Sequence, residues 1–268
     1  MSTATVLGDQ FSFGYDITTA PVGLAGFVAR TGDFKRELEV YAMATDGNGA
    51  TEAIQVAKKT HRKITASFNG YMTTALTTTA AKTAVQSGGL LVTVDGSAKS
   101  FIIKSIKISK KKGEFADVTV DAEYFPLLTG FTASGTAPTG GANGGVNTLL
   151  ENGSLGPAYV FGFQTADAPA VTGFSARNAD LTIEPEVYSE AKDGEGFTTA
   201  LARTGPKITA SFGGYLTAAS LAVLDETFLY PPTTGDFYII KGISDPRRKG
   251  EFVEATLEAE SYENITSA

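Results

Sequence analysis

The chain carries two copies of one sequence pattern. Residues 63–72 read KITASFNGYM and residues 207–216 read KITASFGGYL, so eight of ten positions are identical. A longer pair joins KKKGEFADVTVDAEYF at 110–125 with RRKGEFVEATLEAESY at 247–262. Three shorter pairs occur in the same order along the chain: FVAR (27–30) with FSAR (174–177), VYAMATDGNG (40–49) with VYSEAKDGEG (187–196), and FIIK (101–104) with FYIIK (237–241). A duplication of this kind constrains the fold more than any local pattern does.

The spacing of the copies predicts two homologous domains. The offset between matching segments falls from 147 residues to 144 and then 137, which short deletions in loops of the second copy explain. Each copy, at roughly 110–120 residues, is long enough to build a core of its own. We expect a first domain at 1–126, a linker rich in Gly, Ala and Thr at 127–154, and a second domain at 155–268.

Composition excludes several classes of protein. The 268 residues include no cysteine, which rules out disulfides, zinc-thiolate sites and thiol nucleophiles. A net charge of −7 argues against binding the outside of a nucleic acid by neutralising phosphates. No apolar run approaches the length of a membrane span, and the first residues lack the basic and apolar regions of a signal peptide. We therefore expect synthesis in a cytoplasm.

Alternation of polar and apolar residues predicts antiparallel strands. In 115–124 the apolar side chains Val118, Val120, Ala122 and Tyr124 alternate with Asp117, Thr119, Asp121 and Glu123. The second copy keeps this register, with Ala255, Leu257 and Ala259 against Glu254, Thr256, Glu258 and Glu260. A period of two is typical of a strand with one buried face. The expected fold class is mainly β, with each domain an antiparallel sandwich or barrel.

Turn signals predict two hairpins in each copy. Residues 101–111 pair with 115–124 across a Lys-rich turn that ends at Gly113. A longer hairpin joins 37–45 to 54–68 across Asp46–Gly49, and Asp193–Gly196 is the equivalent turn in the second copy. In this hairpin Thr65 and Ser67 share one face, opposite Ile64, Ala66 and Phe68. Long projecting hairpins leave edges that need a partner, which hints at assembly. The candidate hairpin interface residues are Ile64, Phe68, Tyr71, Ile208, Phe212 and Tyr215.

One helix per copy is expected after the long hairpin. In the first copy it spans 73–86 and ends at Gly88 and Gly89, which favour a left-handed cap. In the second copy it spans 217–225, before Pro231. Many threonines make the first helix intrinsically weak, so tertiary packing must stabilise it.

No catalytic or metal-binding pattern stands out. His61 is the only histidine, and with no cysteine one chain cannot build a multi-histidine metal site or a histidine-based catalytic group. Asp46–Gly49 resembles the start of a calcium loop, but strands on both sides favour a hairpin turn. The glycine-rich segment 139–145 lacks the Lys-Ser/Thr ending of a phosphate loop. We expect no enzyme activity, no metal and no cofactor.

Two charge patterns recur in both copies, and each has two interpretations. The acidic residues are either a solvated strand face or a surface facing something specific, such as a channel that carries DNA. The basic residues are either exposed turns or docking points for the acidic strand of a neighbouring subunit. The acidic set is Asp117, Asp121, Glu123, Glu254, Glu258 and Glu260, and the basic set is Lys110, Lys111, Lys112, Arg247, Arg248 and Lys249.

The order of these elements resembles the tail-tube-type proteins of bacteriophages and of related contractile injection machines. The resemblance is carried by the hairpin strands at 63–72 and 207–216, the helix that follows each, and the GEF-initiated strands at 113–125 and 250–262. It implies a ring whose hairpins form a continuous inner β-barrel, with an acidic lumen along which DNA slides without specific binding. For a duplicated chain, as in baseplate-hub proteins, it implies three chains in a ring of pseudo-six-fold symmetry.

The same resemblance implies partners and a location. The rings would stack into a tube and contact other tail proteins such as sheath, terminator or hub, in a virion tail assembled in the bacterial host cytoplasm. Two alternatives stay open: a carbohydrate- or receptor-binding virion module, and a capsid decoration protein. The chain has no Trp, the residue that favours exposed sugar platforms, which weakens the first alternative.

Overall fold

The computed structural model describes an antiparallel β protein. Among the described residues there is one helix, and all strand pairs are antiparallel. The described residues are 11–12, 15–16, 21–38, 41–45, 54–59, 62–72, 76–94, 97–111, 114, 116–133, 168–217, 226–231, 235–246, 253–263 and 265. The mainly β class expected from the alternating pattern is therefore confirmed.

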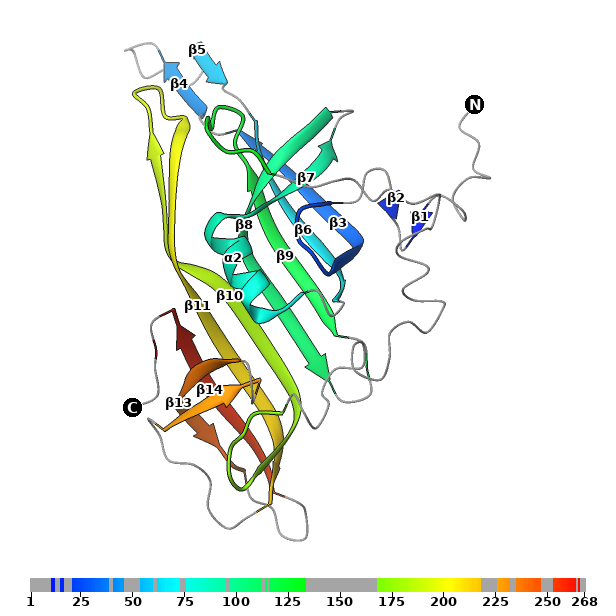
Figure 1. Ribbon diagram of the computed structural model, residues 1–268. Helices are drawn as coiled ribbons and strands as arrows, with labels where there is room; N and C mark the ends of the chain where they lie inside the picture. Colours follow the sequence, from blue (N-terminus) through cyan, green and yellow to red (C-terminus); the bar gives the residue numbers. More distant parts are fainter. Residues whose placement is uncertain are drawn as a thin grey trace.

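The strands fall into two groups along the chain (Figure 1). The first group, with the helix, is β1 (Phe11–Ser12), β2 (Tyr15–Asp16), β3 (Phe27–Leu38), β4 (Tyr41–Thr45), β5 (Ile54–Lys59), β6 (Arg62–Met72), α2 (Thr78–Ser87), β7 (Gly89–Val94), β8 (Ser97–Lys111) and β9 (Asp117–Tyr124). The second group is β10 (Phe174–Lys192), β11 (Thr198–Leu216), β12 (Thr227–Tyr230), β13 (Asp236–Ser244) and β14 (Glu254–Tyr262).

One open sheet joins the two groups. Its strand order is β12-β13-β14-β11-β10-β8-β9-β6-β3, and β7 pairs with β8 beside this path. Ten of the described strands thus form a continuous sheet that does not close, rather than one barrel per copy, while β1–β2 and β4–β5 form separate two-stranded sheets. The length of β8 explains the junction, because its first residues, 97–102, pair with β7 and its last, 106–111, pair with β10.

Both groups repeat the same strand order and the same irregularities. The order β3-β6-β9-β8-β7 corresponds to β10-β11-β14-β13-β12. The β3–β6 ladder has a bulge at Arg30, and the β10–β11 ladder has one at Arg177, at the matching position. A second bulge falls at Lys104 between β8 and β9 and at the matching Lys241 between β13 and β14. Bulges bend strands and redirect side chains, so the matching positions give the two groups the same local shape.

The predicted hairpins are confirmed where the structure describes them. Strand β4 pairs with β5 and β3 with β6 in the first copy, β10 pairs with β11 in the second, and β8 pairs with β9 and β13 with β14. In the turn between β10 and β11, a carboxylate oxygen of Asp193 accepts hydrogen bonds of 2.9 Å from the N–H groups of Glu195 and Phe197. The matching turn at 46–49 lies outside the described residues.

The helix is shorter than its predicted span of 73–86. Helix α2 begins at Thr78 because the hydroxyl of Thr77 caps it, accepting a 3.1 Å bond from the N–H of Ala80. The expected left-handed cap is wrong, since Gly88 has φ −83°. Glycine is still required there, because a Cβ would lie 2.8 Å from the Cα of Ala84. The predicted second helix at 217–225 lies outside the described residues except for Thr217.

The apolar face of the sheet builds one core that spans both groups. Alternate residues of β6, β9, β11 and β14 are buried, as predicted from their pattern. Phe212 packs edge-on against Phe228, Tyr230 and Tyr238, with ring centroids 5.0–6.2 Å apart. Helix α2 buries Ala81, Ala84 and Val85 against this face and contacts β8, β10 and β11. None of the described helices has the length and apolarity needed to cross a bilayer.

Two predictions about interfaces and the linker need correction. Ile64, Phe68, Ile208 and Phe212 were predicted interface residues, but all four are buried in the chain's own core, at most 4% exposed, and cannot meet another subunit. The predicted linker starts at 127, yet its first residues dock on the first strand group. The N–H of Ala133 donates a 3.0 Å bond to the hydroxyl of Ser100, and Ala133 is buried. Residues 134–154 lie outside the described part of the chain.

Candidate functional site

The second face of the sheet, here called the polar face, runs without interruption across both strand groups. One row of directly opposed residues crosses seven strands and is polar throughout: Thr31, Asn69, Thr119, Lys107, Thr182, Thr209 and Glu260. The next row contains Tyr71, Asp117, Ser109, Asp180, Ser211 and Glu258. Opposed residues share a face, so the two rows establish a polar surface wider than either group alone.

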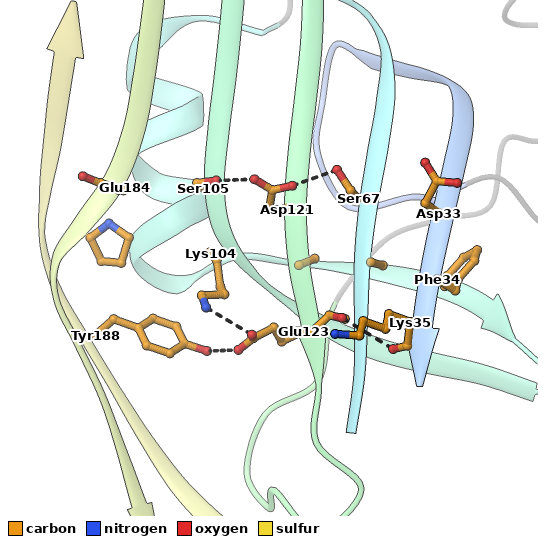
Figure 2. A pocket seen from close by; sticks show the side chains of 14 residues that line it. Asp33, Phe34, Lys35, Ser67, Lys104, Ser105, Asp121, Glu123, Glu184 and Tyr188 are labelled. Carbon is orange, nitrogen blue, oxygen red and sulfur yellow. Dashed lines mark hydrogen bonds and ion pairs between the residues drawn. The ribbon is translucent and has the colours of Figure 1, made fainter. Parts of the chain in front are cut away.

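A depression of about 570 Å³ lies on the polar face where the two groups meet. Figure 2 shows a line of side chains side by side across the depression, from β3 to β10: Asp33, Ser67, Asp121, Ser105 and Glu184. Asp121 accepts hydrogen bonds of 2.8 Å from Ser67 and 2.9 Å from Ser105. Its carboxylate also lies 3.7 Å from the ammonium of Lys107. These contacts fix Asp121 as part of the wall of the depression.

Glu123 is the centre of a cluster that joins the two strand groups. Its Oε2 accepts a 2.8 Å hydrogen bond from the hydroxyl of Tyr188 on β10. Its Oε1 lies 3.1 Å from the ammonium of Lys104 and 3.2 Å from that of Lys63. The bulge at Lys104 turns this side chain toward Glu123. Lys63 also reaches Glu190 on β10 at 3.6 Å, so this cluster makes two polar contacts across the junction (Figure 2 shows the Tyr188 contact).

The cluster changes the ionisation of its members. Burial alone would favour neutral Glu123, but hydrogen bonds from Tyr188 and Lys104 and the charges of Lys63 and Lys104 hold its pKa below the usual value. Burial, and then the hydrogen bond to Glu123, raises the pKa of Tyr188. Glu123 is buried, so both predictions for the acidic set, a solvated face and a lumen-facing surface, are wrong at this residue, while Asp117, Glu254 and Glu258 are exposed on the polar face.

A related cluster occupies the matching positions of the second strand group. Oε1 of Glu260 lies 3.1 Å from the ammonium of Lys207, and its Oε2 accepts a 2.7 Å bond from the hydroxyl of Tyr262. The hydrogen bond from Tyr262, with Lys207 and Lys241 nearby, lowers the pKa of Glu260. Glu260 matches Glu123 in the repeat, but its side chain is 23% exposed, compared with 6% for Glu123. The exposures differ because β10 and its Tyr188 cover Glu123 at the junction, whereas none of the described strands covers Glu260 in this way.

Arg203 fastens the hairpin β10–β11 to the helix of the first group. Its Nη1 lies 3.1 Å from the carbonyl oxygens of Val85, Gly88 and Ile103, to which it donates. Two of these carbonyls end helix α2, where a cation is favourable. Burial lowers the pKa of Arg203. Its guanidinium also lies 5.6 Å from the ring centroid of Phe131.

The predicted basic turns are only partly described. Lys110 and Lys111 belong to strand β8 rather than to a turn, and pair with Ala179 and Asn178 of β10. The ammonium of Lys110 lies 5.6 Å from the ring centroid of Tyr230, and Lys111 forms a 2.8 Å ion pair with Glu114. Both therefore lie at the junction between the groups. Lys112 and the set Arg247, Arg248 and Lys249 lie outside the described residues.

Tyr71 and Tyr215, the remaining predicted interface residues, make matching contacts. The guanidinium of Arg30 lies 4.8 Å from the ring centroid of Tyr71, and that of Arg177 lies 4.9 Å from that of Tyr215. Both arginines are the bulged residues of their ladders. Arg30 also donates a 2.6 Å hydrogen bond to the hydroxyl of Tyr71. These tyrosines are half-buried and remain accessible at the end of the polar face.

The described residues contain no group of three His, Cys, Asp or Glu side chains suited to a metal ion. His61 lies outside them. The carboxylates of the polar face are bonded across strands to lysines, serines and a tyrosine. No family model matches the chain, and no curated protein matches it either.

Sequence reasoning located the acidic strands but missed their partners. Lys63, Lys104 and Tyr188 carry the junction, and none was a predicted site residue. A usable signal was present, because Lys63 matches Lys207, Lys104 matches Lys241 and Tyr188 matches Tyr41 in the repeat. Which strand lies beside β8 could not be read from the pattern, because the repeat fixes pairing within a copy and not between copies.

Proposed function

We propose that this chain is a non-enzymatic structural subunit of a phage tail or tail-like particle, built from two homologous β domains. The matching strand order and the matching bulges at Arg30 and Arg177 support the duplication. In this proposal three chains form a ring of pseudo-six-fold symmetry, and rings stack into a tube. The partners are further copies of the chain and other tail proteins such as sheath, terminator or hub.

The single observation that carries the proposal is the continuous polar face. Eight strands, from β13 to β3, form one open sheet across the junction between the groups, and seven of them, from β14 to β3, carry the polar rows. Three such sheets joined at their edges would give 24 strands, and barrels of 16–18 strands already enclose an aqueous channel. Ring closure would also remove the sheet edges, which otherwise promote aggregation.

The charge on the polar face supports a passage for DNA. Asp117, Asp180 and Glu258 stand in one row on β9, β10 and β14 and are exposed. Carboxylates facing a lumen repel phosphates, so DNA would pass without binding. The lysines on the same face are held by carboxylates, as Lys63 and Lys104 are by Glu123, and offer few unneutralised charges to a phosphate.

Mass measurement and negative-stain microscopy of the purified protein test the proposal. We expect rings with a mass of about 84 kDa, three times the 27.9 kDa chain, or stacks of such rings. A stable monomer at high concentration would refute it. Images in which the protein binds at the symmetry positions of a capsid surface would instead favour a decoration protein. Specific binding on a glycan array would favour the receptor-binding alternative.

A further inference from the structure

The two strands that pair at the junction between the groups, β8 and β10, each match a strand near one end of the sheet, β13 and β3. Inside the chain, residues 106–111 of β8 pair with 178–183 of β10. The repeat matches 106–111 to 243–248 and 178–183 to 31–36. Among the described residues, β3 is the last strand at one end of the sheet, and β12 covers β13 only as far as Ile240.

We propose that β13 of one chain pairs with β3 of a second copy in the register of the internal β8–β10 junction. This inference rests on the proposed ring and adds its specific contact. The internal pair Lys107 and Thr182 becomes Ser244 and Lys35 of two chains, and the internal pair Ile106 and Ile183 becomes Ile243 and Arg36. The occupant is a second copy because the chain already contains one example of the same contact.

Burial at the matching positions supports this contact. At the internal junction Leu181 is 2% exposed and Ile106 is fully buried. Their counterparts at the ends of the sheet, Phe34 and Ile243, are only half-buried. The side chain of Glu260 is likewise more exposed than that of Glu123, as described above. A neighbouring chain would cover all three residues, as the pairing of β8 with β10 covers their counterparts.

Charge at the same positions favours pairing between chains. Ile183 and Ile108 are diagonal neighbours on the core side of the internal junction, where Ile183 opposes Ile106 and Leu181 opposes Ile108. The repeat replaces Ile183 with Arg36 and Ile108 with Asp245. A pair of apolar residues thus becomes a pair of opposite charges. Diagonal neighbours lie about 7–8 Å apart, within reach of an arginine.

The junction cluster extends the contact beyond the paired strands. Tyr41 matches Tyr188, and the backbone pairing agrees, because Tyr188 opposes Arg203 while Tyr41 opposes the matching Lys59. In the assembled pair, strand β4 of one chain takes the place of the matching part of β10, beside the Glu260 cluster of the other chain. Contacts of this kind select the correct register more than they add affinity.

Paired cysteine substitutions test the register. Because the chain has no native cysteine, any disulfide must form between the introduced residues. A variant with Lys35→Cys and Ser244→Cys should form disulfides between chains under mild oxidation and yield a covalent trimer on a non-reducing gel. A variant with Lys107→Cys and Thr182→Cys calibrates the geometry, since its disulfide forms inside one chain. Thr31→Cys with Ser244→Cys is the off-register control, because its partners lie four residues apart, about 13 Å along the strand.

Charge reversal gives a second, independent readout. Arg36→Asp and Asp245→Arg should each lower the assembled fraction about tenfold or more, and the double variant should restore it, because like charges placed together cost several kcal/mol. Rings without the Lys35–Ser244 cross-link, while the calibration pair closes, would overturn the inference and leave the proposed function standing. The inference would also be overturned, and the proposed function left standing, if the wild-type protein forms rings but the double variant does not recover assembly. A protein that never assembles overturns both.

Discussion

The hydroxyl of Tyr188 donates a 2.8 Å hydrogen bond to the carboxylate of Glu123, a residue 65 positions away in sequence, across the junction of the two strand groups. The bond joins the most buried carboxylate of strand β9 to a hairpin of the second group. Together with the paired strands β8 and β10, it makes the sheet one unit. The stability of this junction should therefore depend on pH through both residues.

The acid side of that dependence belongs to Glu123. Its pKa in the folded chain lies below the ordinary 4.5, so its stabilising contribution is present above pH 4.5 and is lost as the pH falls through the folded pKa. We expect Glu123→Gln to cost about 1–3 kcal/mol at pH 7 and to flatten the loss of stability below pH 4.5. Urea unfolding between pH 3 and 7 measures both. An unchanged acid limb in the variant would contradict this role.

The alkaline side belongs to Tyr188. Its pKa in the folded chain is raised above the ordinary 10.0, so its contribution is present below pH 10 and is lost as the pH rises further. Tyr188→Phe keeps the ring and removes the hydroxyl. We expect it to cost about 1–2 kcal/mol at pH 7 and to reduce the destabilisation above pH 10. Tyr262→Phe serves as a control, since its hydroxyl bonds Glu260 away from the junction.

Arg203 provides the third test, because it bonds three carbonyl oxygens at 3.1 Å. Arg203→Met keeps much of the stem but leaves the carbonyls of Val85, Gly88 and Ile103 without this donor. We expect a loss of about 2–3 kcal/mol and lower helix content in circular dichroism. Arg203→Lys should recover only part of the loss, because an ammonium cannot copy the guanidinium geometry. Full stability in Arg203→Met would show that water replaces the donor without cost.

Much of the fold was readable from the sequence, because alternation and turns act locally. The register of β9 and β14 and the hairpin β8–β9 follow from a period of two and a turn signal. The helix start was misplaced by five residues, since any of several threonines could cap it, and Thr77 does. Local patterns carried no information on which threonine the surrounding packing would select.

The junction could not be predicted, because it depends on contacts between residues far apart in sequence. Glu123 has the same polar pattern as Asp121, yet it is buried because β10 passes beside β8 and brings Tyr188 to it. Phe68 and Phe212 lie on a projecting hairpin in sequence and so were predicted at an interface. In the structure the parts of both hairpins that carry these rings, on β6 and β11, lie within the large sheet, which buries the rings in the core.

Two neighbouring glycines in β11 should respond differently to alanine. A Cβ on Gly214 would lie 2.2 Å from the carbonyl oxygen of Ser175, a backbone atom that cannot move aside. The nearest atoms to a Cβ on Gly213 would belong to the side chain of Asn178, which can rotate. The repeat agrees, with Gly70 matching Gly214 but Asn69 matching Gly213. We expect Gly214→Ala to cost about 2 kcal/mol or more and Gly213→Ala less than about 1, measured by urea unfolding. Equal costs would disprove the backbone conflict.

The acidic row of the polar face makes a prediction about DNA. If Asp117, Asp180 and Glu258 face a lumen, replacing all three with Lys turns a repelling wall into a binding one. Assembled particles of this variant should then retain DNA, with an affinity that falls steeply as salt rises, while wild-type particles should not. Electrophoretic mobility shift at 50 and 200 mM salt measures both properties.

A matched control distinguishes the effect of charge in the acidic row from the effect of the total net charge on DNA binding. Replacing Glu114, Glu195 and Glu263 with Lys produces the same net charge, but these residues lie in turns at strand ends, outside the row. Because phosphate attraction depends on a continuous path of positive charge and not only on its total, this control should bind DNA much more weakly than the row variant. Equal binding by both variants would place the acidic row on an ordinary outer surface and remove the support that its charge gives to a DNA passage.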